Sequence, residues 1–151
     1  MGRSWRFVST VLKIIFRHPI LGVTLIPILP DGKIVLARRA DTKQWSLPGG
    51  MVDWGQNIVK TAHRELKEET GLYIVKIKGI SGVYSSPRRD PRIHSISITL
   101  EVQVDGVLNI EDSLEILEVK GFSISELPIG TLAHDHDIQL QNYLAGIVAI
   151  D

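Results

Sequence analysis

Apolar residues are concentrated in two stretches near the start of the chain, at residues 20–28 and 33–38, with Asp31-Gly32 between them. An Asp-Gly pair that separates two apolar runs is a strong signal for a tight β-turn. We therefore expect two antiparallel strands joined by a hairpin. A third, very short strand is expected at residues 45–47, directly before a proline and two glycines.

A helix is predicted at residues 57–70. Val59, Ala62 and Leu66 recur at spacings of three and four, which places them on one helix face and predicts a buried stripe. Gly71 follows the last turn, where a glycine commonly ends a helix in the left-handed conformation.

The clearest strand pattern covers residues 94–104, where apolar residues alternate with polar ones. Such alternation predicts one buried face and one face in contact with water. Further strands are predicted at 72–84, with a break near its glycines, and at 115–123. A last helix is predicted from about Asp135 to Ala149, with four residues facing inward: Ile138, Tyr143, Leu144 and Ile147. These elements predict an α+β domain at residues 20–151, with a mostly β core and helices packed against it.

The first 19 residues are expected to form a separate amphipathic helix or extension. Its apolar residues are Trp5, Phe7, Val8, Val11, Leu12, Ile14, Ile15 and Phe16, and its cations are Arg3, Arg6, Lys13 and Arg17. Packing on the domain or on a partner is the simpler interpretation. A basic amphipathic helix also suits weak contact of residues 3–17 with a membrane surface, and the same segment could pair two copies in a homodimer.

Composition narrows the class of protein. A chain of 151 residues with 44% hydrophobic residues can form one domain with a real core. The formal net charge of zero argues against a nucleic-acid partner. The chain has no cysteine, which excludes disulfides and thiol catalysis and suits a cytoplasmic location.

The candidate chemistry lies on the helix at 57–70. Glu65, Glu68 and Glu69 are three and four residues apart, so their carboxylates share one helix face. Such charges repel one another unless a cation lies among them, and Mg²⁺ or Mn²⁺ prefers carboxylate oxygens. A solvated acidic face paired with lysine or arginine is the alternative.

Residues 50–72 read GMVDWGQNIVKTAHRELKEETGL, and this segment resembles the Nudix box. The matching residues are Gly50, Arg64, Glu65, Leu66, Glu68, Glu69, Gly71 and Leu72. The resemblance implies the Nudix fold, in which a mixed β-sheet packs between helices. It also implies metal-dependent hydrolysis of a pyrophosphate linkage in a nucleoside diphosphate derivative.

The resemblance also implies roles for particular residues. Glu65, Glu68 and Glu69 would hold the metal together with Gly49, and Gly49 and Gly50 would contact the substrate. Arg64 would anchor the helix through a carboxylate, or else it is a plain surface charge. The proton acceptor for the attacking water is left open among Glu68, Glu69, Asp112 and Glu115.

Gln56 departs from the family pattern, which has glutamate at this position. Glutamine keeps an acceptor oxygen but loses the charge, so the metal site is expected to be weakened. In the strongest form of this interpretation the chain is a catalytically silent module that binds a nucleotide. Restoring glutamate should then raise activity.

The segment after the box bears on the substrate. Pro87 lies fifteen residues after Leu72, and with the run from Arg89 to Arg92 it resembles the ADP-ribose pyrophosphatase branch. Arg88, Arg89 and Arg92 are the expected phosphate contacts, unless this loop is merely an exposed turn. The expected reaction converts ADP-ribose to AMP and ribose 5-phosphate. Nucleoside triphosphates and other nucleoside diphosphate sugars are the alternatives.

The cluster from His134 to Asp137 precedes the last predicted helix. Helix capping and interaction with the helix dipole explain Asp135 and Asp137 better than metal binding does.

Overall fold

The computed structural model describes residues 3–111 and 113–151. Its helices are α1 (Arg3–Phe16), α2 (Ile58–Thr70) and α3 (His136–Leu144), and a single 3-10 turn spans Ile124–Glu126. Its strands are β1 (Ile20–Ile28), β2 (Ile34–Arg39), β3 (Trp45–Ser46), β4 (Gly49–Met51), β5 (Tyr73–Tyr84), β6 (Ser95–Asp105), β7 (Ile116–Phe122) and β8 (Ala149–Ile150). The strands join in one sheet in the order β3-β2-β1-β6-β5-β8, while β4 pairs with β1 and β7 pairs with β2.

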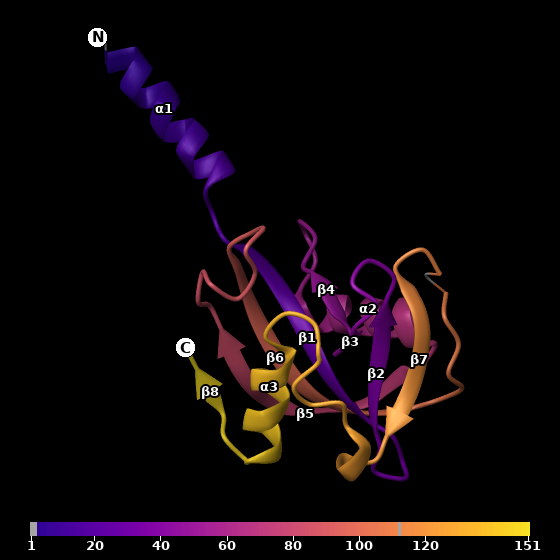
Figure 1. Cartoon of the computed structure of the whole chain (residues 1–151). Coiled ribbons are helices and arrows are strands. Elements are labelled where there is room, and N and C mark those ends of the chain that lie inside the picture. Colours follow the sequence, from indigo (N-terminus) through magenta and orange to yellow (C-terminus); the bar gives the residue numbers. More distant parts are fainter. Residues whose placement is uncertain (1–2, 112) are drawn as a thin grey trace.

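The sheet is mixed, which confirms the predicted α+β class. β1 and β6 are parallel over their whole paired length, whereas β2 and β4 run antiparallel to β1. α2 and α3 cover opposite faces of this sheet (Figure 1). Neighbouring residues of β1 accordingly point into different cores, Leu25 toward the α2 side and Ile26 toward the α3 side.

The ends of α2 follow the sequence signals closely. Asn57 is the N-cap that precedes the helix, and its side chain accepts a hydrogen bond from the Lys60 backbone N–H. Gly71 ends the helix with φ 75°, in the left-handed region where glycine is favoured. The predicted buried stripe is wrong at Val59, which is 48% exposed, whereas Ala62 and Leu66 are fully buried.

The prediction that one face of β6 meets water holds at Gln103, which is exposed, but is wrong nearer the beginning of the strand. Ser97 and Thr99 belong to the supposedly wet face, yet both are buried. The Thr99 hydroxyl donates a hydrogen bond of 2.7 Å to the Gln139 side chain of α3, and the Thr24 and Ser97 hydroxyls lie 2.7 Å apart. A second helix covers this face, and paired hydroxyls make its burial tolerable.

The last helix is shorter than expected. It ends at Leu144, and Gly146 follows with φ 71°, after which the chain forms β8 beside β5. Ile138 and Ile147 were expected to face the core, but they are 55% and 52% exposed. Gln139 and Leu140 are the fully buried residues of α3, so the inward face of the helix is rotated from the one predicted.

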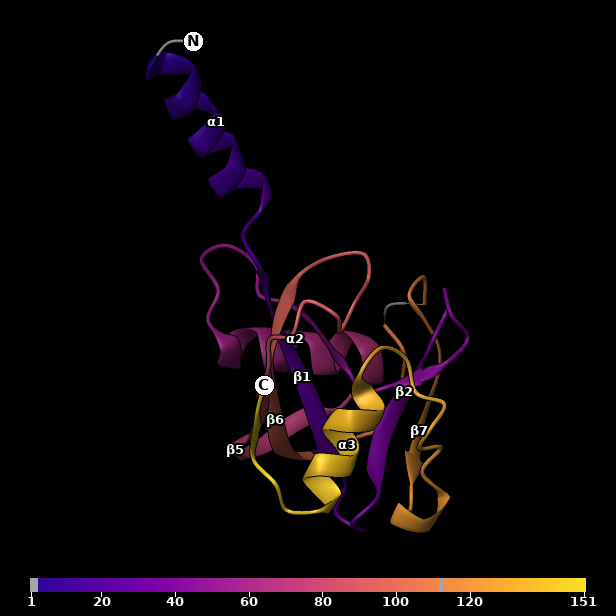
Figure 2. The same ribbon diagram turned by 60° about the vertical axis from the view of Figure 1, so that its left-hand side comes forward.

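α1 extends away from the sheet, and its far end lies well outside the rest of the molecule in both views (Figures 1 and 2). No helix in the described part of the chain is long and apolar enough to cross a membrane.

Candidate functional site

The carboxylates of α2 lie against two glycines of β4. The Gly49 backbone N–H donates a hydrogen bond of 3.0 Å to Oε2 of Glu69. A Cβ atom on Gly50 would lie 2.4 Å from the Glu65 carboxylate, so only glycine leaves room for that side chain. Pairing of β4 with β1 holds both glycines in place. Two adjacent glycines therefore set where two acidic side chains of the box lie.

Arg64 is surrounded by acidic side chains. Its Nη1 atom lies 2.7 Å from Glu65 Oε1 and 3.3 Å from Glu68 Oε2, and its Nη2 atom lies 3.2 Å from Asp53 Oδ2. Nη2 also donates a hydrogen bond of 3.4 Å to the Met51 carbonyl oxygen. These contacts tie α2 to the loop after β4 and compensate part of the charge on Glu65 and Glu68.

Two of the carboxylates have perturbed pKa values. Burial raises the pKa of Glu69 to about 8, and the hydrogen bond from Gly49 offsets this only in part. The pKa of Glu65 is also raised, first by burial, and Glu68 and Glu115 add repulsion against the opposing effect of Arg64. Burial, more than repulsion between charges, therefore disfavours the ionised form of both carboxylates.

This donor set fits a hard divalent cation. Carboxylate oxygens are the preferred ligands of Mg²⁺ and Mn²⁺, and a bound cation would stabilise the ionised carboxylates that burial disfavours. Within residues 3–111 and 113–151, no three His, Asp or Glu side chains already converge as a metal site. Glu65 and Glu68 instead contact Arg64. Binding a cation would therefore require these side chains to rotate on α2.

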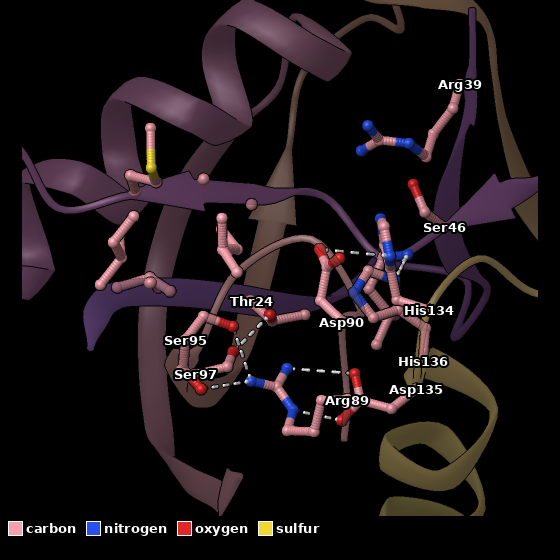
Figure 3. Close-up of a pocket in the computed structure, with 18 of the residues that line it drawn as sticks. Thr24, Arg39, Ser46, Arg89, Asp90, Ser95, Ser97, His134, Asp135 and His136 are labelled. Carbon is pink, nitrogen blue, oxygen red and sulfur yellow. Dashed lines mark hydrogen bonds and ion pairs between the residues drawn. The ribbon is translucent and has the colours of Figure 1, made fainter. Parts of the chain in front are cut away.

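Glu69 lines a cavity of about 190 Å³. Figure 3 shows most of the other residues that line this cavity. Its walls come from β1, from the connection between β3 and β4, from the loop between β5 and β6, and from the segment before α3. Residues far apart in the sequence meet here, among them Arg39, Glu69, Arg89 and His136. Gly49 and Gly50 also line this cavity.

Arg89 reaches this cavity, but its donors are already used within the protein. It makes a two-pronged ion pair with Asp135, with Nε–Oδ2 and Nη2–Oδ1 distances of 2.5 Å and 3.0 Å. Its Nη1 atom donates to the carbonyl oxygens of Tyr84 and Ser95 at 3.1 Å and 3.2 Å. Both charged side chains of the pair are at least nine-tenths buried. Arg89 thus ties the loop between β5 and β6 to the start of α3.

The other two arginines predicted to bind phosphate lie at the surface. Arg88 and Arg92 are exposed, and neither is among the residues that line this cavity in the described structure. Arg92 pairs with Asp90 at 2.8 Å. Arg39, which sequence reasoning did not single out, does line the cavity, where it pairs with Asp41 at 2.8 Å.

His136, from the first turn of α3, contacts the segment that leads into the box. Its Nδ1 atom accepts a hydrogen bond of 3.0 Å from the Leu47 backbone N–H. Burial lowers the pKa of His136 to about 3, so the ring is neutral and its hydrogen lies on Nε2. The two residues are 89 positions apart, and no local pattern could have predicted this contact.

The capping explanation for the acidic residues near α3 is wrong in part. Asp135 makes no side-chain hydrogen bond that caps the helix; it pairs with Arg89 and accepts a bond from Gln139 at 3.0 Å. Asp137 accepts a hydrogen bond of 2.7 Å from the Gly130 backbone N–H and so shapes the loop before the helix.

Gln56 lies at the beginning of α2, away from the C-terminal turns that carry Glu68 and Glu69. Its Oε1 atom accepts a hydrogen bond of 3.3 Å from the Thr61 hydroxyl. The side chain therefore braces the first turn of the helix.

Two candidate proton acceptors come from beyond the box. Asp112 lies outside the described residues. Glu115 is close enough for its charge to raise the pKa values of both Glu65 and Glu69. Its carbonyl oxygen accepts a hydrogen bond of 2.8 Å from the Ala40 backbone N–H, which holds this part of the chain beside the end of β2.

Known proteins share both this sequence and this fold. A NUDIX domain model matches residues 18–143. An ADP-ribose pyrophosphatase of Methanocaldococcus jannaschii is 40% identical over 134 residues, which cover 86% of this chain and 76% of the relative. A putative 8-oxo-dGTP diphosphatase of Bacillus subtilis is 34% identical over 110 residues, covering 72% and 69% of the two chains. The solved NUDIX domain of NrtR from Shewanella oneidensis, in complex with ADP ribose, superposes with a TM-score of 0.74 at 20% identity, covering 95% of this chain and 99% of that one.

The chain belongs to the Nudix family of pyrophosphohydrolases. Within that family it resembles the ADP-ribose pyrophosphatases. Nudix hydrolases generally need divalent cations and act on nucleotide-type small molecules, which agrees with the acidic face of α2 and the adjoining cavity.

Proposed function

We propose that this protein hydrolyses ADP-ribose to AMP and ribose 5-phosphate with Mg²⁺ bound by Glu65, Glu68 and Glu69. The relative from Methanocaldococcus jannaschii supports this substrate. The single observation that carries the proposal is the position of Glu69, which is buried, has a raised pKa and borders the cavity. A pyrophosphate in that cavity would lie beside the carboxylates and the backbone of Gly49 and Gly50.

When bound, a divalent cation neutralises pyrophosphate oxygens and lowers the pKa of water. The protein supplies the remaining parts. Arg64 orients Glu65 and Glu68 through its ion pairs. Gly49 and Gly50 bring the backbone against the carboxylates of Glu69 and Glu65 at the wall of the cavity, and Gly49 would also serve as a metal ligand.

Glu115 is the proposed acceptor of the proton from the attacking water. The three box glutamates would be engaged as ligands, whereas Glu115 reaches the same region from another segment. A carboxylate that accepts this proton lets water attack one phosphorus while the bridging oxygen leaves on the other phosphate. One P–O bond forms and one breaks, which yields AMP and ribose 5-phosphate.

The test is release of AMP from ADP-ribose, measured with Mg²⁺, with Mn²⁺ and with chelator, in the wild type and in Glu69→Gln. Glutamine keeps an oxygen that can accept the hydrogen bond from Gly49, so the variant should fold. We expect metal-dependent AMP release that the variant loses. Release that persists in the variant or in chelator would contradict the proposed metal site.

A panel of substrates separates the related alternatives. The Bacillus subtilis relative is named as a diphosphatase for an oxidised nucleoside triphosphate, so triphosphates belong in the panel with other nucleoside diphosphate sugars. Turnover of one of these alone would keep the mechanism and discard ADP-ribose. Binding of a nucleotide without turnover would favour the catalytically silent module.

The division of the chain is also part of the proposal. Residues 20–151 would carry the hydrolase in the cytoplasm, and residues 1–19 would serve as an extension that binds another surface. A membrane surface and a second copy of the chain are the two candidates for that surface. A truncated protein beginning at residue 20 should therefore keep its hydrolytic rate.

A further inference from the structure

The two faces of α1 differ sharply in chemistry. With 3.6 residues per turn, its described apolar residues fall on one continuous face. They are Trp5, Phe7, Val8, Val11, Leu12, Ile14 and Ile15. The opposite face carries Arg6, Ser9, Thr10 and Lys13. Both hydroxyl groups donate to the Arg6 carbonyl oxygen, at 3.0 Å and 2.8 Å, so this face presents mainly positive charge.

The apolar face of α1 has no cover within the chain. Phe7 is 72% exposed and Ile14 is 65% exposed, and the other described apolar side chains of the helix are also exposed. The helix extends away from the sheet in both views (Figures 1 and 2). A contiguous apolar surface of this kind marks an interaction site.

The charge of this segment is of one sign. Arg6, Lys13 and Arg17 carry positive charge, and no acidic residue precedes Asp31 in the sequence. A second copy of α1 would cover the apolar face but would bring further cations and no counter-charge. An anionic lipid surface supplies both an apolar layer and negative headgroups.

A fully exposed tryptophan lies at the same end of the molecule. Trp54 lies on the loop between β4 and α2, and its side chain is completely exposed. Met51 pairs with Gly22 near the beginning of β1, where α1 joins the sheet. The loop after Met51 therefore lies at the end of the sheet from which α1 extends (Figure 2). Tryptophan favours the boundary between hydrocarbon and water.

We propose that α1 and Trp54 dock the protein on the surface of an anionic lipid bilayer. The docking proposal names the surface that residues 1–19 bind, and it rests on the proposed division of the chain into this extension and the hydrolase. The helix lies along the surface with its apolar face in the acyl layer, Arg6 and Lys13 contact headgroup phosphates, and Trp54 provides a second anchor from the hydrolase domain.

Co-sedimentation of the full chain with vesicles tests this docking. One set of vesicles contains equal parts of phosphatidylglycerol and phosphatidylcholine, and the other contains phosphatidylcholine alone. We expect binding to the anionic vesicles that falls with added salt. The double variant Arg6→Gln with Lys13→Gln removes two cations from α1. Each cation contributes about 1 kcal/mol to binding an anionic surface, so partitioning should weaken about thirtyfold.

A matched control removes the same charge elsewhere. Lys76 and Lys78 are exposed on β5. Lys76 pairs with Gln103 of β6, and Gln103 pairs with Ile28 at the end of β1. Both lysines therefore lie toward the end of the sheet that is far from α1. Lys76→Gln with Lys78→Gln should leave partitioning nearly unchanged. An equal loss in both double variants would overturn docking through α1.

Two further variants address the apolar anchors. Phe7→Ser with Ile14→Ser should abolish sedimentation, and Trp54→Ser should weaken it. None of these residues belongs to the hydrolytic site, so AMP release in solution should stay at the wild-type rate. A protein that binds lipid but does not release AMP would refute the proposed activity and leave the docking intact. A protein that releases AMP normally but does not bind lipid would refute the docking and leave the activity intact.

The oligomeric state decides between the lipid and a second copy. Light scattering in solution should give the same association state for the wild type and for Phe7→Ser with Ile14→Ser, because the apolar face of α1 does not join copies of the chain. A dimer that Phe7→Ser with Ile14→Ser dissociates, together with no binding to anionic vesicles, would show that a second copy covers α1 and would overturn the proposal.

Discussion

The backbone N–H of Gly49 donates a hydrogen bond of 3.0 Å to the carboxylate of Glu69. This bond joins β4 to α2 at the edge of the cavity, and His136 holds the same connection two residues earlier through Leu47. The buried carboxylate of Glu69 thus belongs to a network that spans the box and the beginning of α3.

Replacing either glycine of β4 should have a distinct effect. In Gly50→Ala, the new Cβ would lie 2.4 Å from the Glu65 carboxylate, which is the end of a flexible side chain and can move. We expect a folded enzyme whose kcat/KM falls roughly 10–100-fold, the usual cost of disturbing a metal ligand's surroundings. In Gly49→Ala, the Cβ would lie 2.2 Å from the Val23 carbonyl oxygen, so the fold itself should fail. Thermal unfolding and AMP release together distinguish the two, and a fully active Gly50→Ala enzyme would contradict this account.

The raised pKa of Glu69 should make metal-free stability depend on pH. Burial raises that pKa to about 8 from the ordinary 4.5, so the folded chain binds more protons than the unfolded chain between these values. Stability therefore falls as pH rises through this window. In chelator, we expect the unfolding temperature of the wild type to decline toward pH 8 more steeply than that of Glu69→Gln. Added Mg²⁺ should raise the unfolding temperature of the wild type most at high pH. Parallel curves for the two proteins would argue against the buried carboxylate.

The ion pair between Arg89 and Asp135 should matter mainly for stability. Arg89→Met leaves a buried carboxylate without its cation, which typically costs about 3–5 kcal/mol. Urea unfolding should show this loss, and adding Asp135→Leu should recover part of it. If Arg89→Met instead raised KM for ADP-ribose while stability stayed unchanged, the arginine would be a phosphate contact, as the sequence predicted.

Glu115 should affect the rate more than the binding of metal. Removing the proton acceptor in Glu115→Gln is expected to lower kcat about 10²–10⁴-fold. The Mg²⁺ concentration for half-maximal activity should change little, because the ligands on α2 are untouched. Glu118 provides a matched control, since it pairs with Arg38 at the surface at 3.7 Å. Equal effects of Glu115→Gln and Glu118→Gln would remove Glu115 from the mechanism.

Gln56→Glu tests whether this departure from the family pattern silences the site. A glutamate there can still accept the hydrogen bond from Thr61 and lies near the beginning of α2, remote from Glu68. We therefore expect the free energy of unfolding to change by no more than about 0.5 kcal/mol, and kcat to stay close to that of the wild type, because the contact with Thr61 is kept. A large increase would instead support the interpretation that Gln56 weakens the metal site.

Local patterns predicted most elements of the fold. The hairpin around Asp31-Gly32, the helix that ends at Gly71 and the strands at 72–84 and 115–123 are all present, because turn, cap and alternation signals act between near neighbours. The errors lie where a distant element decides burial. Thr99 is buried only because α3 packs on its face of the sheet, and Ile138 is exposed because of how α3 is rotated against the core.

The sequence by itself determined the family of this protein and the acidic face of its box helix. Helical geometry places Glu65, Glu68 and Glu69 on one face, and the resemblance of residues 50–72 to the Nudix box indicates the family, so both could be recognised without coordinates. Only the tertiary structure decided which groups surround that face. Arg89 is committed to Asp135, and His136 supports Leu47 from 89 residues away. Burial and ion pairing depend on which distant segments the sheet brings together, and no local pattern along the chain records that.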